Sequence, residues 1–135
     1  LNIALIGGGT QTIQSEYGNV IGCGFVSNSE LQNAFSSAIG SISPVVLGRG
    51  IKVKVLDAIA AGCPVWCTNE SLRGFEAFGF NPNLDLGDPG GLAREVRALF
   101  DDPALRAEAR ARLAQAWSEF MSTRPGRLAK LVSSR

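Results

Sequence analysis

The 135-residue chain contains no histidine. Without an imidazole it can form neither a Ser-His or Cys-His catalytic pair nor a histidine-ligated metal site of its own. Cysteine is sparse and odd in number, at Cys23, Cys63 and Cys67. Such a set predicts reduced, buried thiols rather than a disulfide framework. No cluster of metal-ligating residues is visible in the sequence either, so no metal site is expected.

Charge of one sign and long apolar runs are also lacking. The chain has 13 basic and 12 acidic residues. A nucleic-acid binder would show a marked basic excess, so no nucleic-acid partner is expected. No apolar run approaches the roughly 18 residues that a membrane span needs. The hydrophobic share of 45% is nevertheless ample for a core. We expect a cytoplasmic protein, either free or bound peripherally to a membrane.

Short apolar segments alternate with helical patterns along the chain. Strands are predicted at residues 1–6, 19–26, 44–48, 63–68 and 84–88. Helices are predicted at residues 27–40, 51–62, 89–100 and 103–120, and residues 10–19 are predicted to be a loop with at most one helical turn. This alternation indicates an α/β fold with a mainly parallel sheet.

Local signals place the helix ends. Ser27 or Ser29 can cap the first helix, and the pair Asp88–Pro89 is a cap followed by proline. The window 51–62 is ambiguous, because its first residues alternate as in a strand. We favour a helix there, since the window is long, Ala-rich and closed by Gly62.

A glycine turn with cations follows the third predicted strand. Gly48 and Gly50 flank Arg49, and Lys54 follows within the next helix, which starts near Ile51. Glycines allow close approach of backbone N–H groups to an anion, and a helix N-terminus favours negative charge. Together these features predict a phosphate site; the alternative is an ordinary turn with incidental surface cations.

Two other features qualify this prediction. Asp57 lies one helical turn after Lys54, where it can accept hydrogen bonds from a ribose diol or serve only as a helix-dipole partner. The run Gly7 to Gly9 follows a strand, but Thr12 occupies the third glycine position of a dinucleotide fingerprint. We therefore interpret that run as a structural turn, the alternative being that it lines a ligand cleft.

The segment 48–68, GRGIKVKVLDAIAAGCPVWCT, resembles the nucleotide-sugar-binding segment of retaining GT-B glycosyltransferases of the group 1 type. The matching positions are Gly48, Gly50, Lys54, Asp57, Ala58, Ile59, Ala60, Ala61, Gly62, Pro64 and Val65. The strand and helix upstream, and the spacing of Thr68 and Gly74 downstream, follow the order usual in that family.

The resemblance implies a C-terminal, donor-binding half with a Rossmann-like, doubly wound parallel sheet of about five strands and C-terminal helices. Residues 1–120 would form this domain, and residues 121–135 a tail that docks onto a missing N-terminal domain. Arg49 and Lys54 would stabilise the donor diphosphate, with Gly48, Gly50 and Ile51 beside it. Asp57 would bind the ribose hydroxyls, and neither a cofactor nor a metal is implied.

The implied reaction is transfer of a sugar from a nucleoside-diphosphate sugar to an acceptor. That acceptor, a sugar, lipid or small molecule, would bind mainly to the missing domain, so the present chain alone is expected to be inactive. Two alternatives stay open. One is a non-catalytic interaction or regulatory module, favoured by Arg49 at the position of a usual glutamate; the other is half of a nucleotide-sugar epimerase.

Overall fold

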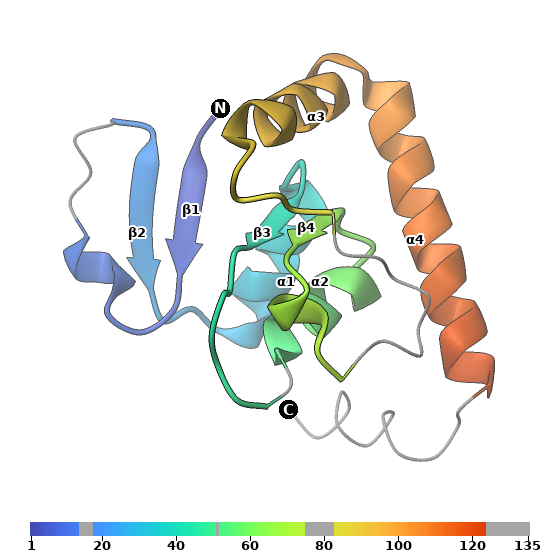
Figure 1. The fold of residues 1–135 in the computed structure, drawn as a ribbon, viewed down its shortest axis with the longest axis horizontal. Coiled ribbons are helices and arrows are strands. Elements are labelled where there is room, and N and C mark those ends of the chain that lie inside the picture. Colours follow the sequence, from blue (N-terminus) through green and yellow to red (C-terminus); the bar gives the residue numbers. More distant parts are fainter. Residues whose placement is uncertain (14–17, 51, 75–82, 124–135) are drawn as a thin grey trace. The chain divides into compact units, whose positions relative to one another are not determined.

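The computed structural model describes residues 1–13, 18–50, 52–74 and 83–123. The chain divides into two compact units, Leu1–Ala34 and Phe35–Arg135, each of which is considered by itself. Among the described residues, four α-helices accompany four short strands (Figure 1). The α/β class expected from the sequence is therefore confirmed.

The first unit is built around two parallel strands, β1 (Ile3–Ile6) and β2 (Val20–Gly24), which lie side by side in Figure 1. Between them, residues 10–12 form a single 3-10 turn, η1 (Thr10–Thr12). Both predicted strands are confirmed, as is the expectation of one helical turn at most in the described part of the connecting loop.

Helix α1 (Asn28–Ser37) starts with a reciprocal cap. The Glu30 amide donates to Ser27 Oγ at 3.2 Å, and the Glu30 carboxylate accepts from the Ser27 amide at 2.7 Å. Of the two predicted caps, Ser27 thus makes the bond to the helix. Hydrogen bonds from the Ser27 hydroxyl and amide lower the pKa of Glu30.

The second unit also pairs two parallel strands, β3 (Ser41–Ser43) and β4 (Val65–Cys67), joined through helix α2 (Val53–Ala60). The predicted helix in the ambiguous window is confirmed, and Gly62 follows it with φ of +64°. The core lies between α2, β4 and α4. It contains Val55, Ile59, Cys67 and Leu72, with Val65, Leu113 and Trp117 packed against it.

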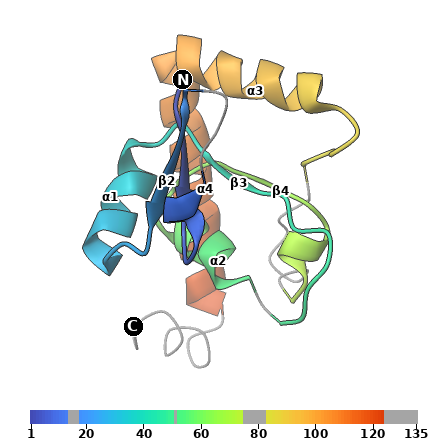
Figure 2. The same cartoon turned by 90° about the vertical axis from the view of Figure 1, so that its left-hand side faces the viewer.

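Helices α3 (Pro89–Asp101) and α4 (Pro103–Thr123) form an angled pair, visible in both views (Figures 1 and 2). Asp88 caps α3 by accepting from the Gly91 amide at 2.8 Å. Asp102 caps α4 in the same way, accepting from the amides of Ala104 and Leu105. Each aspartate precedes a proline, so both predicted helix starts are confirmed. No helix within the described ranges has the length and apolar character to cross a bilayer.

Arg110 of α4 ties together the ends of two other helices. Its guanidinium donates to the carbonyls of Phe35 and Ala38 at the end of α1, and to the carbonyl of Gly62 just after α2. Helix C-termini present unpaired carbonyls and a partial negative charge, which a cation stabilises. One half-buried arginine therefore fixes where α2 ends relative to α4.

The third predicted strand is displaced. We expected it from Pro44 to Gly48, but β3 spans Ser41–Ser43 and ends before the proline. Proline cannot donate to a strand ladder, so pairing with β4 stops at the Thr68 amide, which donates to the Ser43 carbonyl at 3.3 Å. The residues that follow Pro44 lie outside the strand and form a turn.

The prediction of a fifth strand at residues 84–88 is wrong. The amides of Asn83 and Leu84 both donate to the carbonyl of Cys67 at 3.1 Å. The Asn83 side chain accepts from the Cys67 amide at 3.0 Å and donates to the Val65 carbonyl at 3.1 Å. A side-chain amide thus replaces a strand along the edge of β4, and the chain then turns at Asp85 into the cap of α3.

The described residues form two separate two-stranded parallel sheets, not a single sheet of five strands. Helix α4 continues to Thr123, so the first residues of the predicted tail 121–135 belong to that helix. The rest of the tail, and with it the predicted docking, lies outside the described residues.

Candidate functional site

The predicted glycine turn lies where the sequence placed it, after β3 and before α2. We call residues 44–50 the β3 turn. Gly48, Arg49 and Gly50 are all exposed in it. Gly50 has φ of +79°, a left-handed conformation that favours glycine, and an added Cβ there would meet no atom within 4 Å. Within the part of the chain that the structure describes, no atom therefore covers Gly50. Ile51 lies outside the described residues.

Lys52 brings a positive charge onto the β3 turn. Its Nζ donates to the carbonyl of Gly50 at 3.1 Å and to that of Arg49 at 3.5 Å. A Cβ added at Gly48 would come within 2.9 Å of the same amine, so glycine leaves room for it. Sequence reasoning did not assign Lys52 to the site. Its spacing of two or three residues from those carbonyls is the signal that would have revealed the contact.

Lys54 and Asp57 lie on the less buried side of α2, while Val55, Leu56 and Ile59 are buried in the core. Lys54 is exposed and Asp57 half-buried. No side-chain hydrogen bond caps the start of α2 within the described structure. The structure thus brings Gly48, Arg49 and Gly50 together in the turn and places Lys54 and Asp57 on the following helix. Their binding roles stay predictions.

A cluster of hydroxyl groups joins the carboxyl ends of β3 and β4. Ser71 is fully buried; its hydroxyl donates to the Ser43 carbonyl at 2.7 Å and accepts from the Ser43 hydroxyl at 2.9 Å. The Thr68 hydroxyl contacts Ser71 Oγ at 3.0 Å and donates to the carbonyl of Val45 in the β3 turn. Sequence reasoning missed this network, because Ser43 precedes the strand predicted at residues 44–48 and no local signal shows that the ends of β3 and β4 are neighbours.

The glycine turn of the first unit, residues 7–10, is the β1 turn. The Gly7 amide donates to the Gly24 carbonyl at 2.8 Å, and the Gly24 amide donates to Thr10 Oγ1 at 2.8 Å. The Thr10 hydroxyl also lies 2.9 Å from the Leu5 carbonyl and 2.8 Å from that of Gly7. These contacts join both strand ends to the turn and support its interpretation as structural.

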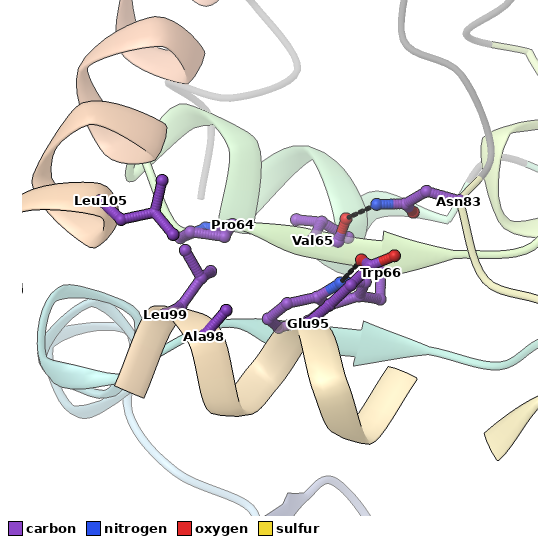
Figure 3. A pocket seen from close by; sticks show the side chains of 8 residues that line it. All are labelled: Pro64, Val65, Trp66, Asn83, Glu95, Ala98, Leu99 and Leu105. Carbon is purple, nitrogen blue, oxygen red and sulfur yellow. Dashed lines mark hydrogen bonds between the residues drawn. The ribbon is translucent and has the colours of Figure 1, made fainter. Parts of the chain in front are cut away.

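A shallow hollow of about 290 Å³ lies between β4 and the helical pair (Figure 3). Its walls include Trp66, whose indole N–H donates to the Glu95 carboxylate at 2.7 Å, and Asn83 beside Val65. The hollow begins at Pro64, on the amino side of β4. Ligands of open α/β sheets bind at the carboxyl ends of the strands, so this hollow is separate from the candidate site.

The thiols play no part in the candidate site. Cys63 and Cys67 are buried and free, and burial raises the pKa of both. Cys23 is exposed on β2 and also free. Within the described ranges, no group of three or more Cys, Asp or Glu side chains is arranged to hold a metal ion.

Comparison with known proteins gives one match. A sequence model of the family described as "Glycosyl transferases group 1" matches residues 1–102, which include both glycine turns, α2 and β4. No curated protein and no solved structure matches the chain.

Proposed function

Because this chain belongs to the group 1 glycosyl transferases, we propose that it is the donor-binding half of such an enzyme and holds a nucleoside-diphosphate sugar at the β3 turn. One observation carries the proposal. An open glycine turn with Arg49 and Lys52 leads directly into the start of α2, which no side chain caps in the described structure.

The arrangement suits the chemistry of glycosyl transfer. As the bond to the sugar breaks, negative charge develops on the departing diphosphate. Preorganised cations and a helix N-terminus stabilise that charge as it forms. In the proposal Arg49 and Lys54 bind the diphosphate, and Asp57, about one turn further along α2, accepts hydrogen bonds from the ribose hydroxyls. The amine of Lys52 shapes the turn and adds to its positive potential.

The proposal extends to the complete enzyme. We assign the chain to the C-terminal half of a GT-B enzyme that retains the anomeric configuration, on the resemblance of residues 48–68. The acceptor would bind a second domain, so the present chain would bind donor without turnover. The doubly wound sheet expected from the sequence belongs to the same proposal. Parallel strands are normally buried on both faces. In the first unit Ile3 and Ile21 are 46% and 50% exposed, which supports a larger sheet in the complete enzyme.

A binding experiment tests the donor site. The purified chain is titrated with UDP, GDP and ADP by calorimetry, with inorganic pyrophosphate as a probe of the phosphate contacts alone. Loss of one charged hydrogen bond costs about 1.5–3 kcal/mol, so Lys54→Ala or Arg49→Ala should raise the Kd roughly tenfold or more. Arg112→Ala is the matched control, because Arg112 is exposed and pairs with Glu108 on α4.

Asp57→Asn separates the two parts of the ligand. This substitution should raise the Kd for nucleoside diphosphates and leave the Kd for pyrophosphate unchanged. Equal Kd values in the wild type, Lys54→Ala and Arg49→Ala would overturn the assignment of the cations. If Asp57 is only a dipole partner of the helix, Asp57→Asn should instead lose about 0.3–1 kcal/mol of stability and keep its affinity.

A non-catalytic module is the second candidate function. It is favoured by Arg49, which stands where the family usually carries a glutamate in contact with the donor sugar, and which the structure shows exposed in the turn. The two functions differ in the full-length protein. Release of nucleoside diphosphate from a sugar donor in the presence of acceptor identifies a transferase, whereas binding without release identifies a module.

A further inference from the structure

The β3 turn is attached to the second unit by a side chain from a distant part of the sequence. Thr68 stands 23 positions after Val45, and its hydroxyl donates to the Val45 carbonyl. That carbonyl lies two residues beyond the end of β3 and three before Gly48. The bond therefore acts where the chain leaves the sheet and starts towards the candidate phosphate site.

The surroundings of Thr68 make this bond effective. Its amide donates to the Ser43 carbonyl at 3.3 Å, and its hydroxyl accepts from the Ser71 amide at 3.2 Å. Ser71 is itself fully buried and bonded to Ser43. The Thr68 side chain is thus held from β3 and from the segment after β4, and a polar bond shielded from water is worth more than an exposed one.

The hydroxyl network contains fewer protons than oxygen contacts, so the Thr68 proton has two alternative acceptors. Three hydroxyl groups supply three protons, yet four oxygen contacts compete for them. Ser43 donates to Ser71, and Ser71 donates to the Ser43 carbonyl. The Thr68 proton then goes either to the Val45 carbonyl or to Ser71 Oγ, at 3.0 Å. Only the first choice ties the turn to the end of β4.

We propose that Thr68 is a positioning residue of the donor site: its hydroxyl holds the β3 turn in the conformation that binds the diphosphate. The inference rests on the proposed function. Thr68 does not itself touch the ligand; it acts through the Val45 carbonyl on the glycines and cations that follow. Replacing the Thr68 hydroxyl by a group that cannot donate should therefore leave the fold in place and increase the motion of the turn.

The first experiment compares Thr68→Val with Thr68→Ser in the whole chain, using UDP and inorganic pyrophosphate as probes. Valine keeps the shape of threonine but cannot donate, so the Kd for both probes should rise about three- to tenfold, the usual value of one neutral hydrogen bond. Serine retains the hydroxyl and should restore the wild-type Kd. Ser122→Ala is the control, since it removes a hydroxyl that donates to the Glu119 carbonyl within α4.

The second experiment needs no ligand. Amide hydrogen exchange should accelerate at residues 45–50 in Thr68→Val, while the amides of Val55 to Ile59 in α2 keep their wild-type protection. Uniform acceleration through α2 would show that Thr68 supports the fold and not the turn, and would overturn the inference. Unchanged exchange in the turn together with an unchanged Kd would do the same.

Ser71→Ala tests the proton choice and is also informative if Thr68→Val does not fold. It removes the competing acceptor, so Thr68 should donate to Val45 throughout. The UDP Kd should then not rise, and exchange in the turn should not accelerate. A Kd raised tenfold in Ser71→Ala with slow exchange retained in the turn would contradict the role given to Thr68. Failure of the wild-type chain to bind any nucleoside diphosphate would instead overturn the proposed function, and the exchange data would show separately whether Thr68 holds the turn.

Discussion

Each unit of this chain has a glycine turn at the carboxyl end of its first strand, and the two turns are held differently. The β1 turn is held mainly by its own last residue, since the Thr10 hydroxyl lies within 2.9 Å of the carbonyls of both Leu5 and Gly7. The β3 turn is held by Thr68, from beyond β4. The first turn has a hydroxyl of its own that bonds the Gly7 carbonyl and also bonds Gly24, whereas the start of the second is held by a hydroxyl 23 positions away in the sequence.

The two turns also differ in charge. No basic residue occurs before Arg49 in the sequence, so the β1 turn offers an anion no cationic side chain, and its Gly7 amide and Thr10 hydroxyl are already bonded to Gly24. The β3 turn carries Arg49 and receives the amine of Lys52. A glycine turn alone is thus weak evidence for a phosphate site. Open backbone together with cations is what distinguishes the second turn.

The largest expected effect comes from closing the space behind the β1 turn. A Cβ added at Gly22 of β2 would overlap the carbonyl group of Thr10, which is backbone and cannot rotate away. Gly22→Ala should therefore lose about 1–3 kcal/mol of stability, measured by urea unfolding. If the β1 turn is structural only, the folded variant should bind UDP with the wild-type Kd. A weakened Kd without loss of stability would place the first turn in the site as well.

A matched pair of glycines gives a sharper comparison with a smaller effect on stability. Gly9 and Gly50 have φ of +81° and +79°, and an added Cβ would meet no atom within 4 Å at either. Alanine should therefore cost about 1–2 kcal/mol at each through backbone strain alone. Only Gly50→Ala should also raise the UDP Kd, because only it alters the conformation of the β3 turn. Urea unfolding and calorimetry of both variants measure the two quantities, and equal losses of affinity would remove the distinction between the turns.

Sequence patterns predicted the elements whose causes are local. The predicted caps at Ser27 and Asp88 depend on residues within three positions, and both are present in the structure. Helix α2 was predicted correctly because its apolar spacing and Gly62 act within one segment. The β3 turn was located for the same reason, since its glycines and cations are contiguous in the sequence.

The errors arose where distant residues decide the structure. Residues 84–88 have strand-like spacing, but Asn83 supplies its side-chain amide to β4 in place of a backbone ladder. The third strand ends before Pro44, which has no N–H to donate, and its last ladder bond comes from a distant residue, the Thr68 amide, which donates to the Ser43 carbonyl. The hydroxyl network and the folding back of Lys52 likewise depend on which strand ends are neighbours, which periodicity does not specify.

The smallest expected effect is the pH dependence of the cap at the start of α1. Hydrogen bonds from Ser27 lower the pKa of Glu30 below its ordinary value of 4.5. A carboxyl group with a lowered folded pKa contributes stability that is present above the unfolded pKa and is lost as the pH falls through the folded value. The cap of α1 should therefore weaken as the pH falls below 4.5, shown by faster amide exchange in the first turn of the helix. Glu30→Gln should remove this pH dependence while Ser27 still caps the helix. The β3 turn is the internal control, because its described charged groups are Arg49 and the amine of Lys52. Its amide exchange, corrected for the intrinsic effect of pH, should not change over the same range. An equal acid response in both segments would show instead that the whole chain is loosening, and would contradict a local effect of Glu30 on the cap of α1.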